Sequence, residues 1–409
     1  MQRKNLPSRK IKIFRATFLR RKAQIYNTPS LSLYFNSNVD DKYKKSRKET
    51  KMEITYDNFI SLMYAKADKN SIPFSGAFEL TSRCTLDCKM CYIHQNGGNC
   101  PSAEKNGEWW VNLAREARDA GTLLLLLTGG EPLLHPDFED IYLKCREMGL
   151  LVTVNTNATL IDDEKVRFFK ENPPQRLNIT LYGASEETYE SLCGNGKAFE
   201  RVVGAIKKLN EANVKIRINY SITPQNFQDA ATVQSWAKEW GLPIQPVSYI
   251  VPPVRVCGER VRLSPEDAAR EQLLWHKRAF GNDMDAYVRS RDLPLDIEDF
   301  GECRDPNGER INCRAGLSSY WVTYDGFLLP CGMIPEPKIQ ISNFAESFKF
   351  IRQEREKIIL PAKCKYCNFK KVCDNCAAVS FAETGSFSEA PEYACKKAQA
   401  YAKFASQIL

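Results

Sequence analysis

Three cysteines stand close together in one short stretch of the chain, at Cys84, Cys88 and Cys91. Their C-x3-C-x2-C spacing places three thiol groups in a single loop, and three thiolates are suited to bind an iron–sulfur cluster. A cubic cluster has one more iron than this loop has cysteines, so one iron stays open to chelation by a small molecule. The loop therefore predicts a reactive metal centre.

The elements that must position this loop follow a repeated pattern from residue 74 onward, in which short apolar runs alternate with amphipathic helices such as 108–120, 136–148 and 198–212. Near-continuous apolar strands separated by helices are typical of a parallel sheet covered by helices. Six such units are too few for a closed eight-stranded barrel, so we predict an α/β fold with a partial (β/α)6 TIM-like barrel. The expected strands are 74–81, 122–128, 150–155, 177–182, 214–222 and 243–249.

In barrels of this kind the chemistry gathers on the loops at the carboxyl ends of the strands. The cysteine loop follows the first expected strand, and 128–131 ends the second. Residues 155–157 end the third strand and 180–183 the fourth. We therefore expect all four segments to lie at one mouth of the barrel.

Changes in this pattern divide the chain. Residues 1–51 form a basic extension, which is either a disordered arm, a transit peptide or a segment upstream of a true start at Met52. Residues 52–73 are a lead-in, and residues 74–262 form the barrel core. Residues 263–302 form a helical linker, and residues 303–409 form a small cysteine-rich domain organised by metal.

The chain has 409 residues, 43% of them hydrophobic, and a net charge of +8. Residues 1–51 contain 15 Lys/Arg and 3 Asp/Glu, whereas the remainder contains 43 basic and 47 acidic residues, so we expect no nucleic-acid partner for the body. No apolar run reaches the length of a membrane or signal segment, so we expect no membrane partner and a cytoplasmic location. Fifteen cysteines in such a chain indicate metal binding and not disulfides.

The cysteine loop and the segment Gly129-Gly130-Glu131-Pro132 resemble the radical S-adenosylmethionine (radical SAM) superfamily over residues 74–250. The resemblance implies that the three cysteines hold a [4Fe-4S] cluster and that SAM chelates the open iron. It also implies that Gly129, Gly130 and Glu131 lie against the SAM amino group, with Glu131 as the acceptor. Weaker candidates, for contacts with the SAM ribose or carboxylate, are Asn155, Asn157 and Thr180. An Asn in such a loop is as often a turn former as a ligand contact.

Two positions depart from the family pattern. Met90 stands where many members have an aromatic residue, and its thioether can cover the same apolar spot near adenine. Tyr182 stands where related enzymes often have a carboxylate, which indicates a different substrate.

The C-terminal cysteines resemble the SPASM domain, an accessory module that follows radical SAM cores. The resemblance implies one auxiliary [4Fe-4S] cluster on Cys313, Cys331 and Cys376, with Cys303 as a candidate fourth ligand. It implies a second auxiliary cluster on Cys364, Cys367, Cys373 and Cys395. Two residues separate Cys373 from Cys376, where the family usually has three.

The alternative for the central C-terminal cysteines is a structural zinc site, because two C-x2-C pairs suit tetrahedral zinc. Zinc ribbons usually separate such pairs by about fifteen to twenty residues. Here only five residues separate them, so we favour clusters. The remaining cysteines are Cys100, Cys145, Cys193 and Cys257, and we assign them no metal. For Cys193 we favour a structural role in a loop over a contact with the substrate.

The resemblance implies an enzyme that reductively cleaves SAM to a 5′-deoxyadenosyl radical and takes a hydrogen atom from its substrate. SPASM-bearing enzymes largely modify peptides and proteins, so we predict a thioether or C–C cross-link, or formylglycine-type oxidation, with a flavodoxin- or ferredoxin-type electron donor. The sulfatase-maturase branch usually has an Asp after the cysteine that matches Cys331, and here Gly332 argues against formylglycine formation. No catalytic side chain is assigned.

Two further hypotheses remain open. One is a small-molecule dehydrogenase or cofactor-biosynthesis enzyme built on the same core. The other is a non-catalytic protein, either an iron–sulfur electron carrier or a zinc-organised binding module. The segment 129–131 argues against an electron carrier, which needs no SAM site.

Overall fold

The computed structural model describes residues 30–31, 54–93, 104–255, 261–289, 291 and 308–407. The chain divides into two compact units, Met1–Asn70 and Ser71–Leu409. In the first unit, β1 (Ser30–Leu31) pairs antiparallel with β2 (Ile54–Thr55), and α2 (Tyr56–Asn70) follows. The predictions for the basic extension, apart from 30–31, and for Cys100, Cys257 and Cys303 lie outside the described residues.

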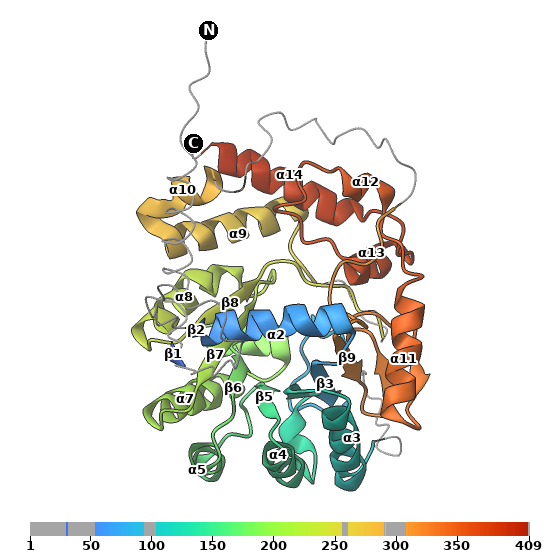
Figure 1. Ribbon diagram of the computed structural model, residues 1–409. Helices are drawn as coiled ribbons and strands as arrows, with labels where there is room; N and C mark the ends of the chain where they lie inside the picture. The colour runs from blue at the N-terminus through green and yellow to red at the C-terminus, as the bar shows by residue number, and fades with distance from the viewer. Residues whose placement is uncertain are drawn as a thin grey trace, which may run out of the picture. The chain divides into compact units, whose positions relative to one another are not determined.

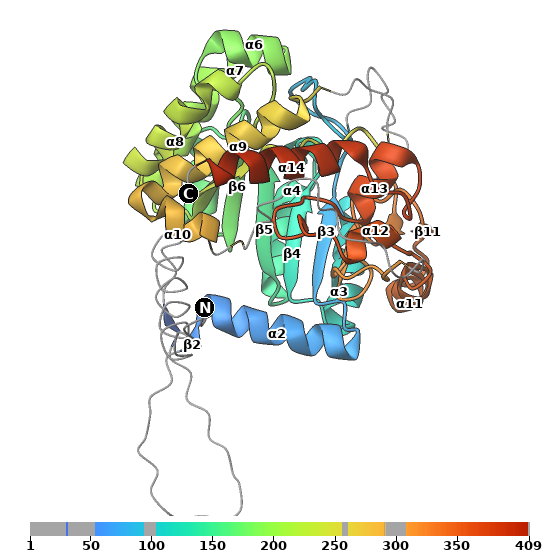
Figure 2. The same cartoon turned by 90° about the horizontal axis from the view of Figure 1, so that it is seen from above.

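The second unit is built on a nine-stranded sheet with the order β11-β10-β9-β3-β4-β5-β6-β7-β8 (Figure 1). Its strands β3 to β8 pair in parallel, each with the next, which confirms the predicted partial barrel. Figure 2 shows β3, β4, β5 and β6 side by side. The six strands are β3 (Ser75–Glu79), β4 (Leu124–Thr128), β5 (Leu151–Thr156), β6 (Arg176–Thr180), β7 (Ile216–Ser221) and β8 (Ile244–Val247).

Helices connect these strands and cover the outer face of the sheet, as Figure 1 shows for α3, α4, α5 and α7. Phe78 of β3 contacts Trp110 of α3, with ring centroids 5.1 Å apart. The outward residues of the strands, such as Leu127, Val154 and Ile179, are fully buried. The connecting elements are α3 (Gly107–Asp119), η2 (Pro132–Leu134), α4 (Phe138–Glu147), α5 (Asp163–Glu171), α6 (Glu186–Cys193), α7 (Ala198–Glu211), η3 (Phe227–Asp229) and α8 (Ala230–Glu239).

The inner face of the sheet is polar, because alternate residues of a strand point to opposite faces. The strand register places Asn155, Asn178 and Arg217 side by side on β5, β6 and β7. One step nearer the carboxyl ends, Thr180 and Asn219 are neighbours on β6 and β7. These polar residues therefore line the inside of the barrel below its mouth.

The C-terminal part extends the same sheet. β9 (Ser319–Val322) pairs in parallel with β3, and β10 (Phe327–Leu329) and β11 (Ile339–Gln340) follow as antiparallel strands. The strand pattern of the sequence did not predict these three strands. The helices of this part are α9 (Pro265–Phe280), η4 (Gly281–Asp283), α10 (Met284–Arg289), α11 (Phe344–Arg355), α12 (Ala362–Lys365), α13 (Ala377–Thr384) and α14 (Glu392–Ser406).

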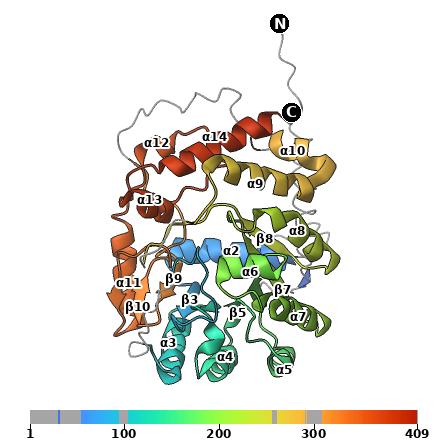
Figure 3. The same cartoon turned by 180° about the vertical axis from the view of Figure 1, so that it is seen from behind.

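The two long helices of this part, α9 and α14, run alongside each other (Figures 1 and 3). Ser264 begins α9, and its hydroxyl accepts a hydrogen bond from the Asp267 backbone N–H at 3.1 Å, as the Ser-Pro-Glu-Asp start predicts. His276 Nδ1 lies 2.8 Å from the Tyr401 hydroxyl across the helix pair. Among the helices of the described ranges, none is long and apolar enough to span a membrane.

Candidate active site

The cysteine loop follows β3, and its three thiols lie close enough to influence one another. Burial raises the pKa of Cys84 to about 12, and the neighbouring thiols of Cys88 and Cys91 contribute in the same direction. The Cys91 backbone N–H donates to the Cys88 carbonyl at 2.9 Å, which turns the loop between them. All three thiols are free of disulfides, as a metal-binding loop requires.

The glycine segment after β4 packs directly on the backbone that leads into this loop. The N–H groups of Gly130 and Glu131 donate to the carbonyls of Thr81 and Arg83, each at 2.8 Å. A Cβ on Gly129 would lie 2.5 Å from the Thr81 oxygen, and one on Gly130 would lie 2.2 Å from the Arg83 oxygen. These glycines are therefore required to join the two loops, whatever ligand they also meet.

The Glu131 side chain is fully buried between the ends of β4 and β5. Its carboxylate accepts hydrogen bonds from the Thr156 hydroxyl and the Asn157 backbone N–H, both at 2.8 Å, and from the Leu133 N–H at 3.2 Å. Burial raises the pKa of Glu131 to about 7, and these bonds lower it in part. Glu131 thus joins two strand ends, and its predicted contact with the SAM amino group stays a prediction.

Asn157 holds the cysteine loop from the end of β5. Its amide nitrogen donates to the Thr85 hydroxyl at 3.0 Å and lies 3.5 Å from the Cys84 sulfur. Its amide oxygen accepts from the Thr159 backbone N–H at 3.0 Å. The predicted role of Asn157 as a SAM contact is untested, whereas its hydrogen bonds to the loop are direct.

The other two predicted SAM contacts lie on the inner face. Asn155 Oδ1 accepts from the Asn178 amide at 2.7 Å, and Thr180 stands half-buried at the end of β6. Next to Thr180, the buried Asn219 Oδ1 has no hydrogen-bond partner among the described residues. A buried carbonyl oxygen without a donor is costly unless a ligand supplies one. Sequence analysis missed Asn219, although the alternation of 216–221 could have placed it inward.

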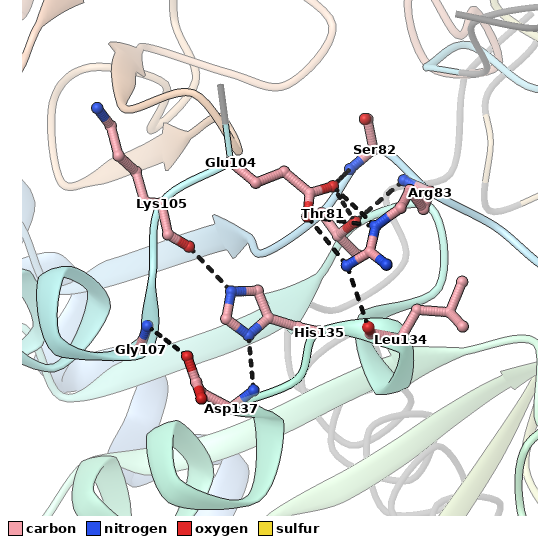
Figure 4. A network of polar contacts seen from close by, with 9 residues as sticks. All are labelled: Thr81, Ser82, Arg83, Glu104, Lys105, Gly107, Leu134, His135 and Asp137. Carbon is pink, nitrogen blue, oxygen red and sulfur yellow. Dashed lines mark hydrogen bonds and ion pairs between the residues drawn. The ribbon is translucent and has the colours of Figure 1, made fainter. Parts of the chain in front are cut away.

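A polar network fixes the base of the cysteine loop (Figure 4). The Arg83 guanidinium donates to the Glu104 carboxylate at 3.0 Å and to the Leu134 carbonyl at 3.2 Å. The Thr81 hydroxyl also bonds to Glu104. His135 continues the network, because its Nε2 lies 2.9 Å from the Lys105 carbonyl and its Nδ1 accepts from the Asp137 N–H at 3.1 Å. The network links β3, α3 and η2 around the residues that precede Cys84.

The carboxyl end of α6 forms another wall of the loop. The Asp87 N–H donates to the Cys193 carbonyl at 2.9 Å, and Cys193 itself is fully buried. Cys193 and Tyr182 lie near enough to Cys88 to influence its pKa. The contact with Cys193 and burial hold the pKa of Cys88 well above its usual range. Nothing local in the sequence marks Cys193 as a neighbour of Cys88.

A buried ion pair lies beside the same loop. The Glu79 carboxylate, at the end of β3 and 1% exposed, accepts from Arg255 Nη2 and from the Trp321 indole N–H, each at 2.8 Å. Tyr92 follows Cys91, and its pKa is raised by burial and then by the charge of Glu79.

The same group extends towards the C-terminal cysteines. The charges of Cys91 and Cys331 also act on the pKa of Tyr92, and the charge of Arg255 acts on that of Cys331, so the Glu79–Arg255 pair lies near the cysteine loop and near Cys331. A Cβ on Gly332 would lie 2.8 Å from the Trp321 ring, so the indole occupies the space that an aspartate at this position would need.

The C-terminal thiols gather in two sets. Burial raises the pKa of Cys331 to about 11, with further contributions from the thiols of Cys376 and Cys313. Burial likewise raises the pKa of Cys373 to about 12, and its neighbouring thiols are Cys395 and Cys364.

A pocket lies at the second set, with about 720 Å³ of empty space, part of it open to solvent. Its lining includes Cys364, Cys367, Cys373, Cys376 and Cys395. Within the described ranges, no three cysteine, histidine or carboxylate side chains converge on the position of a single metal ion.

Comparison with known proteins identifies the domain that carries the cysteine loop. Residues 78–236 match the Radical SAM superfamily. This chain carries a radical SAM domain. The radical SAM enzyme is 29% identical over 335 residues to the AdoMet-dependent heme synthase of Methanosarcina barkeri, covering 78% of this chain and 95% of that protein. It is 22% identical over 262 residues to the sporulation killing factor maturation protein SkfB of Bacillus subtilis, covering 64% and 60%.

Solved structures show the same fold. Streptococcus suis SuiB bound to S-adenosylmethionine superposes with a TM-score of 0.59 at 19% identity, covering 94% of this chain and 88% of that one. Native anSMEcpe with bound AdoMet and the Kp18Cys peptide gives a TM-score of 0.62 at 18% identity, covering 82% and 98%. The predicted radical SAM domain and the enzyme class are confirmed, and the predicted SAM and [4Fe-4S] cofactors follow from that domain.

The residues at the barrel mouth fit these cofactors. Three thiols that form no disulfide stand in one loop, and Asn157 and the glycine segment hold that loop in place. The unpaired Asn219 oxygen offers an acceptor to a hydroxyl or amine of a ligand inside the barrel. Met90 lines a small apolar pocket with Ile250 and Val251, in keeping with its predicted apolar role.

Proposed function

We propose that this enzyme oxidatively modifies a substrate that binds between the cysteine loop and Cys331, and that the substrate is a small molecule of the tetrapyrrole class. The observation that carries the proposal is the buried Glu79–Arg255 pair with Trp321 and Tyr92, which lies near the cysteine loop and Cys331. Such a buried polar group suits binding and orientation of a substrate next to two redox centres.

The chain's own residues have distinct tasks in this proposal. Cys84, Cys88 and Cys91 would hold the [4Fe-4S] cluster, and Asn157 and Gly130 keep their loop in position. When bound, the cluster and SAM supply one-electron chemistry that produces a radical able to remove a hydrogen atom from carbon. The residues proposed to hold SAM are Gly129, Gly130, Glu131, Asn155, Asn157 and Thr180, with Asn219 added from the structure.

The protein must also exclude water from the reaction, because a carbon radical reacts with any accessible hydrogen donor. The fully buried Glu131 and the nearly fully buried Glu79 make the mouth a closed polar environment. The C-terminal cysteines would hold two auxiliary clusters that accept the electron left after hydrogen removal, on Cys303, Cys313, Cys331 and Cys376 and on Cys364, Cys367, Cys373 and Cys395. Zinc at the second set is the alternative.

The substrate class rests on two observations. The heme synthase of Methanosarcina barkeri matches this chain over 95% of its own length, and a second protein of that organism, named Fe-coproporphyrin III synthase, matches over 166 residues at 26% identity. Trp321 fills the place of the aspartate that formylglycine formation would use, which argues against that reaction.

Peptide maturation is the second candidate, favoured by the similarity to SkfB and by the fold shared with SuiB, whose structure was also solved bound to the precursor peptide SuiA. In either case we expect a flavodoxin- or ferredoxin-type protein to supply the reducing electron.

The experiment that separates the candidates uses reconstituted enzyme with SAM and dithionite under anaerobic conditions. We expect 5′-deoxyadenosine release to rise at least tenfold on addition of Fe-coproporphyrin III, with a change in the porphyrin mass. A rise only with a precursor peptide encoded beside the enzyme's own gene would overturn the tetrapyrrole proposal in favour of peptide maturation.

A further inference from the structure

The loop between Cys373 and Cys376 brings an asparagine side chain to the second set of C-terminal cysteines. The amide nitrogen of Asn375 donates a hydrogen bond to the Cys364 sulfur at 3.6 Å. Both residues line the pocket at this set, as do the other cysteines of the set. A polar N–H donor therefore points at one of the sulfurs around this pocket.

The orientation of the Asn375 amide is set through its oxygen. The hydroxyl of Ser380, a fully buried residue of α13, donates to Asn375 Oδ1 at 3.2 Å. The Ser380 backbone N–H in turn donates to the Cys376 carbonyl at 2.9 Å, so α13 holds two residues of the loop. Because its oxygen is bound to Ser380, the amide presents its nitrogen, and not its oxygen, to Cys364.

The residue on the other side of Asn375 is also anchored. Asp374 forms an ion pair with Lys397 of α14, whose side chain is 2% exposed. The loop is thus held by α13 and by α14. A donor that is already held in place loses little conformational entropy when it bonds to the sulfur.

The meaning of this hydrogen bond changes if Cys364 binds iron, as in the proposed function. A cysteine that ligates iron is a thiolate, which has no proton and can only accept hydrogen bonds. The reduced state of a cluster carries more negative charge than the oxidised state, so a donor on a ligand sulfur stabilises the reduced state more. The Asn375 amide is such a donor.

We propose that Asn375 is a positioning residue that raises the reduction potential of the second auxiliary cluster through its hydrogen bond to Cys364. The inference rests on the proposed function, in which four thiols including Cys364 hold that cluster. A higher potential makes the cluster a better acceptor for the one electron that the substrate loses after hydrogen removal. The bond also gives a role to the short spacing at this loop, because Asn375 is one of the two residues between Cys373 and Cys376.

The test is a potentiometric titration, followed by electron paramagnetic resonance, of reconstituted full-length protein that carries Cys84→Ala, Cys88→Ala and Cys91→Ala. This background leaves about eight irons, in the two auxiliary clusters. Asn375→Leu keeps the size of the side chain without its N–H. We expect it to lower the equilibrium constant for reduction of one cluster roughly fivefold, which is a fall of about 40 mV in one midpoint, while the other midpoint stays in place.

Two further variants test the sign and the specificity. Asn375→Asp keeps an oxygen for Ser380 but brings a negative charge to the sulfur, so the same midpoint should fall further than in Asn375→Leu. Asn312→Leu is the matched control, because Asn312 lines the same pocket and, within the described ranges, its amide donates to no cysteine. This control should leave both midpoints near those of the background.

Unchanged midpoints in both Asn375 variants, at the iron content of the background, would overturn the inference and leave the proposed function intact. If these variants do not take up the second cluster, Ser380→Ala decides by the same titration, because it keeps Asn375 and removes only the hydroxyl that orients its amide. A lower midpoint in Ser380→Ala supports the inference, and no shift overturns it. Zinc in place of the second cluster in the background protein would overturn the cluster assignment of the proposed function, and this inference with it.

Discussion

At the scale of single residues, Gly130 shows how little room the site leaves. Its position would bring a Cβ within 2.2 Å of the Arg83 carbonyl oxygen, and backbone cannot move aside as a side chain can. We expect Gly130→Ala to lower the free energy of unfolding by about 2 kcal/mol or more and to reduce cluster uptake. Thermal unfolding and iron content measure the two effects.

Gly204 provides the matched control for this substitution. It lies inside α7, and a Cβ there would meet nothing within 4 Å. Gly204→Ala should therefore stabilise the protein by about 0.5 to 1 kcal/mol. Equal effects of the two substitutions would contradict the close packing of the glycine segment on the cysteine loop.

We expect Glu79 to support binding and orientation of the substrate, and not SAM cleavage. Its carboxylate orients Arg255 and Trp321 near the cysteine loop and Cys331. Glu79→Gln should reduce product formation at least tenfold, whereas uncoupled release of 5′-deoxyadenosine persists, because the cysteine loop and the inner face remain intact. Parallel loss of both activities would show that Glu79 instead supports the cluster loop.

At the scale of elements, the pairing of α9 with α14 predicts a dependence of stability on pH. Burial lowers the pKa of His276 to about 4 from its usual 6.5, and its Nδ1 lies 2.8 Å from the Tyr401 hydroxyl. Below pH 6.5 His276 is protonated in the unfolded chain but stays neutral in the folded protein. The free energy of unfolding therefore falls as the pH drops from 6.5 to about 4. The loss from this residue approaches about 3 kcal/mol at pH 4.

His276→Gln isolates this contribution, because the amide stays neutral and can still bond to Tyr401. Urea unfolding at pH 7, 5 and 4 gives the free energy of unfolding of each protein. As the pH falls, this free energy should decrease more for wild type than for His276→Gln. A pH-independent difference between the two would mean that His276 titrates normally in the folded protein.

Helix α14 also positions the second set of C-terminal cysteines. Lys397, 2% exposed, forms an ion pair with Asp374 and donates to the Gln272 side chain of α9 at 2.6 Å. Asp374 directly follows Cys373. Because the loss of a buried partner leaves the loop unsupported, we expect Lys397→Met to reduce bound iron from about twelve to about eight atoms.

The neighbouring Lys396→Met is the control for this prediction. Lys396 is exposed and pairs with Glu392 at 2.7 Å within α14, and exposed pairs contribute little to stability. Its iron content should equal that of wild type. An unchanged iron content in Lys397→Met would show that the Lys397–Asp374 ion pair is not needed for cluster binding.

At the scale of the whole molecule, local patterns in the sequence were sufficient for the six βα units, because each strand and helix has its own periodicity. They were not sufficient for β9, whose Trp321 pairs with Ala77 of β3. That pairing joins segments more than 240 residues apart and leaves no local signal.

The site shows the same limit. The cysteine loop and the glycine segment carry recognisable spacing, whereas Cys193, Glu79 and Arg255 acquire their roles only from tertiary contacts. Chain topology, and not motif, brings these three residues to the barrel mouth.

In the proposed function, one radical SAM core and two C-terminal clusters serve a single substrate space. The most direct test is the iron and zinc content of anaerobically reconstituted protein, measured together with 5′-deoxyadenosine release from SAM under dithionite. We predict about twelve irons per chain, no zinc and clear SAM cleavage. About four irons with bound zinc would contradict the auxiliary clusters, and absence of SAM cleavage from fully loaded protein would contradict the proposed function.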